Sequence, residues 1–186
     1  MIPPATVCRR RWDDPDAAAL RAAMTGELRQ RYADRPDDPI HLPPAQALAA
    51  GSMAFTGVAY TAEAIPVGHA ALRWHGPDLE LKRMYVLPAY RGRGVAEILL
   101  DAASEAAGQL GAARIVLQTG DRQPDAVRRY ERAGYRPIPV FPPYDVLPYS
   151  RCFALVVRPP LTLPPKATVP APSRPFLPPA TAARAL

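Results

Sequence analysis

Two arginines and two glycines fill four consecutive positions, Arg91 to Gly94, in the segment YRGRGVAEILL. An apolar, helix-compatible run follows them directly. A helix N-terminus carries unpaired backbone amides and about half a positive charge, and glycine allows a backbone to approach a ligand closely. The turn is therefore suited to a pyrophosphate. Taken alone, so short a motif is equally compatible with a purely structural turn.

The spelling of this turn excludes two well-known nucleotide-binding motifs. A Walker loop ends in Gly-Lys-Ser or Gly-Lys-Thr, which the chain lacks here. The dinucleotide fingerprint needs a third glycine three residues after Gly94, where the chain has Glu97. Neither type of nucleotide site is expected.

The turn follows a predicted strand and precedes a predicted helix. Leu79, Leu81 and Tyr85 nearly alternate within residues 78–87, as side chains on one face of a strand do. Apolar residues then recur at three- and four-residue spacing up to Gly111, which predicts a helix. The apolar stripe of this helix comprises Val95, Ile98, Leu99, Ala102, Ala106 and Leu110.

The rest of the pattern predicts a single α/β domain with a mixed sheet. Asp14 and Pro15 form a helix start, and an apolar face with four-residue spacing follows them. That face comprises Leu20, Met24, Leu28 and Tyr32. Further strands are predicted over 6–12, 52–62, 66–76, 113–119 and 150–157, a later helix over 123–134 and a loop over 35–46. The order is an antiparallel meander followed by a strand-helix-strand crossover.

Two motifs give the chain a resemblance to a known superfamily. MYVLPAYRGRGVAEILL closely resembles the acetyl-CoA-binding segment of the GNAT superfamily of N-acetyltransferases, in which a strand ending in Val-x-Pro precedes Arg/Gln-x-x-Gly-x-Gly/Ala. The matching positions are Val86, Pro88, Arg91, Gly94 and Ala96. QPDAVRRYERAGY is similar to a later helix of that superfamily, with Tyr130, Gly134 and Tyr135 at its motif positions. The resemblance covers residues 78–157 in sequence and residues 5–157 in topology. Within the superfamily, the chain resembles uncharacterised bacterial small-molecule acetyltransferases.

The resemblance implies a mostly antiparallel central sheet flanked by helices, over a domain of residues 1–157, with acetyl-CoA as co-substrate and no metal. The amides of the turn would hold the pyrophosphate, and the strand edge before it would pair with the pantetheine arm. The candidate cofactor-binding residues are Met84, Tyr85, Val86, Arg91, Gly92, Arg93, Gly94, Val95, Ala96 and Gln123. Gln123 stands where many members have asparagine, and Gln118 replaces an acid expected in similar sequences.

The resemblance also implies roles for single side chains. An attacking amine must lose a proton, and Glu80 is the candidate base, acting directly or through water. The departing thiolate must gain a proton, and Tyr130 is the candidate acid. Glu80 could equally be a solvated residue at a sheet edge, and Tyr130 an aromatic side chain packing on the sheet. In FPPYDVLPYS, Tyr144 is a candidate for lining the substrate site, whereas the prolines there could simply stiffen a connection.

Charge and proline content change beyond residue 157. Residues 158–186 hold nine prolines and four basic residues without an acid, so residues 1–157 carry only +2 of the chain's net charge of +6. A nucleic-acid partner is therefore not expected. The tail is expected to be disordered and to have no function of its own. The alternative is that it is a ligand for a domain that binds proline-rich segments, although the sequence does not identify such a partner.

The number and spacing of cysteines, histidines and apolar residues argue against a disulfide framework, a metal site and a membrane span. Cys8 and Cys152 are too few and too far apart for a disulfide framework or a zinc site, and the histidines lack metal-ligand spacing. The histidines are His41, His69 and His75. Since no segment approaches the ~20 apolar residues of a membrane span and no export signal is recognised, we expect a soluble, cytoplasmic protein.

We therefore expect a transferase that moves the acetyl group of acetyl-CoA to a primary amine of a small molecule by direct attack. A protein amine is an alternative acceptor. A non-catalytic acyl-CoA sensor or scaffold of the same fold is the alternative from a different class. The sequence does not identify the acceptor amine. It is compatible with a homodimer.

Overall fold

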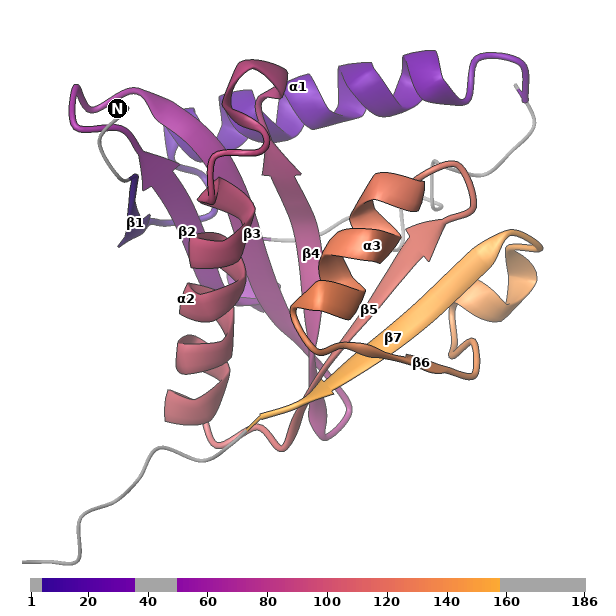
Figure 1. The fold of residues 1–186 in the computed structure, drawn as a ribbon. Coiled ribbons are helices and arrows are strands. Elements are labelled where there is room, and N and C mark those ends of the chain that lie inside the picture. The colour runs from indigo at the N-terminus through magenta and orange to yellow at the C-terminus, as the bar shows by residue number, and fades with distance from the viewer. Residues whose placement is uncertain (1–4, 36–49, 158–186) are drawn as a thin grey trace, which may run out of the picture.

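The computed structural model describes residues 5–35 and 50–157, which form one seven-stranded sheet with helices on both faces (Figure 1). The strands are β1 (Thr6–Arg9), β2 (Met53–Tyr60), β3 (Pro66–His75), β4 (Asp78–Val86), β5 (Arg114–Gly120), β6 (Arg136–Ile138) and β7 (Ser150–Val156). The helices are α1 (Pro15–Arg31), α2 (Val95–Gln109) and α3 (Pro124–Arg132). The predictions for His41, for most of the proline-rich loop and for the tail lie outside the described residues.

The predicted fold class is confirmed, and the strand order is β1-β2-β3-β4-β5-β7-β6. Neighbouring strands are antiparallel except β4 and β5, which α2 connects as a parallel crossover. The short strand β6 was not predicted, because three residues that include a proline carry no readable alternation. It pairs only with β7. Among the described residues, no helix is both long and apolar enough to cross a membrane.

The parallel pairing between β4 and β5 is short. It joins only Leu79 to Ile115 and Glu80 to Val116, whereas β5 pairs with β7 along its whole length. Beyond Glu80 the two strands diverge, and α3 lies beside the gap (Figure 1). The backbone edge of β4 that faces this gap, up to Val86, therefore has no strand partner.

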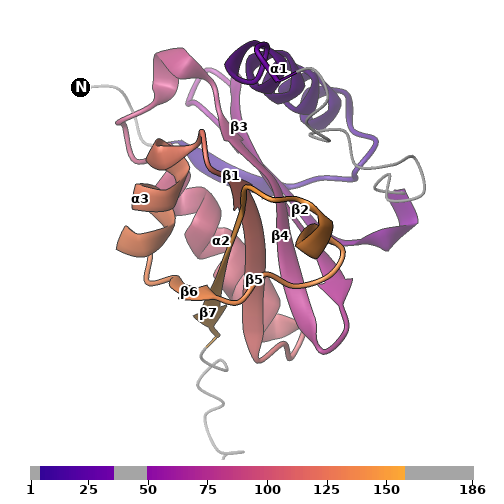
Figure 2. The ribbon, with the colours of Figure 1, turned by 90° about the vertical axis from the view of Figure 1, so that its right-hand side faces the viewer.

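Helices cover the two faces of the sheet differently, with α1 on one face and α2 and α3 on the other (Figure 2). The larger core lies under α2 and includes Leu99 and Ile115, while a smaller core under α1 includes Leu20 and Val58. Gly68 lets α2 approach β3 closely, since a Cβ there would lie 2.8 Å from a methyl carbon of Leu99.

A bulge in β4 changes which face its side chains reach. Arg83 has a φ of +55°, and the register with β3 shifts between His69 and Ala71. Leu81 consequently packs in the core under α2, while Tyr85 packs in the core under α1. The alternation predicted from the sequence is wrong past Arg83, because an extra residue in a strand reverses the faces that follow it.

The bulge is held by His69, which is fully buried on β3. Its Nδ1 lies 2.8 Å from the carbonyl oxygen of Arg83, and its Nε2 lies 3.4 Å from Nη1 of Arg21. Because a carbonyl only accepts and a guanidinium only donates, Nδ1 carries the proton and Nε2 accepts. Burial lowers the pKa of His69 to about 4, and the charge on Arg21 contributes to this.

This pKa predicts that the protein loses stability in acid. A histidine whose pKa is lowered on folding stabilises the fold fully above its unfolded value near 6.5, and this contribution disappears as the pH falls through 4. The free energy of unfolding should fall by up to about 3 kcal/mol over that range on this account. Urea unfolding of His69→Gln between pH 7 and pH 4 should show a shallower decline. His75→Gln, at a half-buried histidine, is the control and should keep the parent slope. Equal slopes for His69→Gln and the parent protein would contradict the assignment.

Candidate functional site

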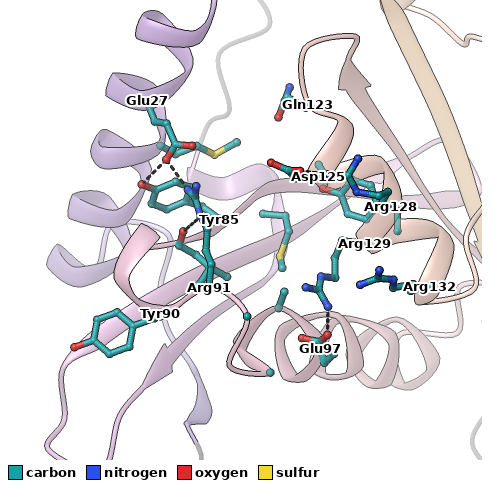
Figure 3. A pocket seen from close by; sticks show the side chains of 18 of the residues that line it. Glu27, Tyr85, Tyr90, Arg91, Glu97, Gln123, Asp125, Arg128, Arg129 and Arg132 are labelled. Carbon is teal, nitrogen blue, oxygen red and sulfur yellow. Dashed lines mark hydrogen bonds and ion pairs between the residues drawn. The ribbon is translucent and has the colours of Figure 1, made fainter. Parts of the chain in front are cut away.

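Two cavities meet where β4 and β5 separate. The first cavity, of about 430 Å³, lies between α1, the end of β4, the turn before α2, and α3 (Figure 3). The second cavity, of about 180 Å³, lies between α1, the middle of β4, the end of β5 and the start of β7. Both are lined by Met24, Leu28, Met84, Gln123, Ala126 and Tyr130. The half-buried Met24 and Leu28 of α1 thus line both cavities, the buried Tyr32 lines the second, and the buried Leu20 of the same predicted face lines neither.

The N-terminus of α2 opens onto the first cavity without a side-chain cap. Gly94 has a φ of +82° and Gly92 a φ of +71°, a left-handed conformation that glycine adopts without a Cβ clash. In α1, by contrast, Asp14 accepts hydrogen bonds from the amides of Asp16 and Ala17 at 3.0 and 3.1 Å. The chain caps α1 with its own carboxylate, whereas the first-turn amides of α2 are free for an anion.

The predicted turn residues divide into those that reach the first cavity and those that do not. Arg91, Gly92, Gly94 and Ala96 line it. The side chain of Val95 packs in the core, so only its backbone can serve a ligand. Arg93 lies outside the cavity, with its guanidinium carbon 5.5 Å from the ring centre of Tyr90.

Arg91 is held by two neighbours. Its Nε donates to the carbonyl oxygen of Val86 at 3.0 Å, and its Nη2 donates to Glu27 of α1 at 2.5 Å (Figure 3). The hydroxyl of Tyr85 donates to the same carboxylate at 3.2 Å. Hydrogen bonding from Arg91 keeps the pKa of Glu27 below its usual range. Glu27 was missed from the sequence, because nothing local in its helix indicates contact with the turn.

The first cavity is rich in arginine. Besides Arg91, it is lined by Arg31 of α1. Arg128, Arg129 and Arg132 of α3 also line it (Figure 3). Arg129 pairs with Glu97 and Arg128 with Asp125, while Arg132 forms no ion pair within the described part of the chain. This surplus of guanidinium groups favours a polyanionic ligand. The spacing of basic residues in AVRRYER was a signal that could have indicated it.

Tyr130 separates the two cavities and is almost completely buried on α3. Its ring packs against Tyr135, and its hydroxyl forms no hydrogen bond within the described residues. Burial raises the pKa of Tyr130 well above its usual range. The phenol is therefore protonated at neutral pH and can donate a hydrogen bond. Met84, Tyr85, Val86 and Gln123 also line the first cavity, as expected for the cofactor candidates.

Glu80 lies in a buried ion cluster rather than at a cavity. Its side chain is fully buried, and its carboxylate accepts from Nε of Arg73 at 2.7 Å and Nζ of Lys82 at 3.1 Å. The hydroxyl of Tyr144 donates to the same carboxylate. Burial alone would raise the pKa of Glu80, but the charge of Lys82 and these hydrogen bonds hold it below its usual range. Glu80 is neither a solvated edge residue nor a lining residue of either cavity.

Tyr144, which was expected to line the substrate site, also lies away from the cavities. It is fully buried, packs edge-on against Phe141 and lines neither cavity. The member of this cluster that reaches the second cavity is Lys82. The structure therefore brings Tyr130 and most cofactor candidates together at the cavities but leaves Glu80 and Tyr144 behind the cavity wall.

The second cavity has a polar wall that the sequence did not reveal. Lys82 and Arg83 line it from β4, and Gln118 and Ser150 line it from β5 and β7, joined by a hydrogen bond of 3.2 Å. Asp121 also lines it and pairs with Arg35. Among the described residues, no three His, Cys, Asp or Glu side chains are grouped as metal ligands.

Comparisons with known proteins agree with this arrangement. A model of the acetyltransferase (GNAT) family matches residues 18–135. An uncharacterised N-acetyltransferase of Mycobacterium tuberculosis is 35% identical over 71 residues, which are 38% of this chain and 46% of that protein. The match thus spans about half the length of these mycobacterial relatives. An IAA acetyltransferase of Azospirillum brasilense is 29% identical over 115 residues, 62% of this chain and 75% of that protein. A Klebsiella pneumoniae protein, thought to be an acyl-CoA N-acyltransferase, superposes with a TM-score of 0.70 at 25% identity, covering 83% of this chain and 98% of its own.

The wall of the second cavity contains a close approach that can be tested. The Tyr32 hydroxyl is buried and has no hydrogen-bond partner among the described residues, and a Cβ on Gly120 would lie 2.0 Å from it. Gly120→Ala should lower the free energy of unfolding by about 1–3 kcal/mol. Tyr32→Phe should restore most of this loss, because the next atom, Cζ of the ring, is 3.1 Å away. Urea unfolding of both single variants and the double variant measures the coupling. Strictly additive effects would show that the two groups do not meet.

Proposed function

Because the chain belongs to the acetyltransferase (GNAT) family, we propose that it transfers the acetyl group of acetyl-CoA to a primary amine of a small molecule. The observation that carries this proposal is the uncapped N-terminus of α2, which lies beside the unpaired edge of β4 on one cavity. A pyrophosphate can accept hydrogen bonds from the free amides of the helix N-terminus, and an amide-rich arm can pair with the strand edge.

The described residues fit acetyl-CoA, which supplies an acetyl group activated as a thioester. The free amides between Gly92 and Ala96 bind the pyrophosphate, and the arginines of α3 add positive charge for further phosphate oxygens. The edge from Met84 to Val86 hydrogen-bonds the pantetheine amides in place of a strand. Cys8 and Cys152 are both free thiols, which suits a reducing cytoplasm.

Tyr130 is the proposed general acid. Its protonated hydroxyl stands between the cavity for the cofactor and the cavity for the acceptor, where the thiol leaving group departs. Glu80 acts instead as a positioning residue, because its carboxylate holds Lys82 against the second cavity. The amine loses its proton to solvent in that cavity.

The second cavity is the proposed acceptor site. It adjoins the first cavity through Tyr130 and Met84, so an amine there faces the end of the pantetheine arm. Its volume of about 180 Å³ lies below the ~300 Å³ at which sites for drug-sized ligands begin. A cavity of this size accommodates a small amine, which is the acceptor that we propose.

Cofactor binding tests the phosphate site directly. Calorimetric titration should show that the parent protein binds acetyl-CoA and that Gly94→Glu weakens binding at least ~100-fold, since a carboxylate then faces the pyrophosphate. Gly111→Glu is the matched control, because Gly111 has a φ of +76° and equally open surroundings but follows the C-terminus of α2. It imposes similar backbone strain and should leave affinity unchanged. Full binding by Gly94→Glu would refute the phosphate site.

Turnover tests the acid. With a panel of amines and detection of the released thiol, Tyr130→Phe should lower kcat by ~10²–10⁴-fold while leaving acetyl-CoA affinity within about threefold. Tyr135→Phe is the control, since the Tyr135 hydroxyl is buried with no hydrogen-bond partner in the described ranges and Tyr135 lines neither cavity. Undiminished kcat in Tyr130→Phe removes that residue from the role. Acetyl-CoA binding without thiol release from any amine favours a sensor.

A further inference from the structure

We propose that the acceptor carries, on the same small molecule as its amine, a carboxylate or phosphate group that the guanidinium of Arg83 binds in the second cavity. This inference rests on the proposed function, because it describes the molecule that the acceptor cavity selects. It concerns a different ligand from acetyl-CoA, since Arg83 lines the second cavity and not the first.

The backbone of Arg83 is in a conformation that must be maintained by its surroundings. A non-glycine residue at a φ of +55° is strained, and such residues cluster at functional sites. Here the Nδ1–H of the buried His69 donates to the Arg83 carbonyl at 2.8 Å and fixes the bulge. The fold therefore sets an arginine at the wall of the acceptor cavity.

The guanidinium of Arg83 has no partner in the part of the protein that the structure describes. Its side chain forms no hydrogen bond and no ion pair within residues 5–35 and 50–157, although the residue is exposed and lines the cavity. The other charges at this wall are committed, because Lys82 donates to Glu80 and Asp121 pairs with Arg35. A planar guanidinium with free donors matches a carboxylate or phosphate through two parallel hydrogen bonds.

The surroundings carry more positive charge than the described carboxylates neutralise. Glu80 alone serves both Arg73 and Lys82, so that cluster keeps one positive charge before Arg83 is counted. Arg21 of α1 forms no ion pair within the described residues, where it contacts the carbonyl oxygen and ring of Trp12 and the His69 ring. An anion beside Arg83 is therefore electrostatically favoured.

Matched acceptors test this inference in the full-length protein saturated with acetyl-CoA. The probes are glycine, β-alanine and 4-aminobutyrate, the aminoalkylphosphonates of the same lengths, and the amides of the three amino acids, which keep the amine and lose the negative charge. Thiol release should give at least one anionic amine a kcat/KM about tenfold or more above its amide. The phosphonate and carboxylate arms distinguish the two anions.

Variants identify the residue responsible. Arg83→Gln should lower kcat/KM for the preferred anionic amine by ~10–100-fold, leave its amide within about twofold and leave acetyl-CoA affinity unchanged. Arg83→Lys, which keeps the charge, should retain part of the preference and also guards against misfolding of the glutamine variant. Arg29→Gln is the control, because Arg29 is exposed on α1, lies outside both cavities and forms no ion pair with another described residue.

Three outcomes overturn the inference. The amides could react as well as the anionic amines, Arg83→Gln could slow both classes equally, or acetyl-CoA could bind while no anionic amine releases thiol. Failure of the proposed function has a separate signature, which is the absence of calorimetric acetyl-CoA binding by the parent protein.

Discussion

The site depends on how briefly β4 and β5 pair. The two strands form only two parallel residue pairs, at Leu79 and Glu80 of β4. Beyond these pairs β5 is paired only with β7, and the edge of β4 that faced β5 has no strand partner. Backbone N–H and C=O groups need hydrogen-bond partners, so those at an open edge within a sheet must bind a ligand or solvent. Both cavities and Tyr130 lie along this opening. The sheet is continuous at one end, which stabilises it, and divided at the other, where chemistry is proposed.

The bulge at Arg83 adds a second constraint. By reversing the faces of β4, it places Leu81 under α2 and Tyr85 under α1, where the Tyr85 hydroxyl meets Glu27. The same carboxylate holds Arg91, so α1, β4 and the turn before α2 share one ionic link. One unusual residue therefore orders both the wall of the second cavity and the support of the turn before α2.

Much of the fold and half of the site could be predicted because the relevant signals are local. The glycine turn, the apolar stripe of α2 and the motif around Tyr130 are each readable within about a dozen residues, and the structure brings them to one cavity. The surroundings of Glu80 are not local, since Arg73 lies on β3 and Tyr144 comes from a distant turn. Strand alternation alone cannot distinguish a carboxylate at a cavity from one in a buried cluster. Charged and apolar residues alternate in this strand up to Lys82, and the second adjacent charge, Arg83, was the available sign that alternation would fail there.

The shared walls of the two cavities have a thermodynamic consequence. Because Met84 and Tyr130 belong to both, a ligand that orders these side chains from one side also changes the surface offered on the other. Any such effect is reciprocal, so whatever factor one ligand contributes to the affinity of the second is returned in equal measure. The dividing wall thus makes any coupling between the two cavities a property of the fold, and that coupling has the same size whichever cavity is filled first.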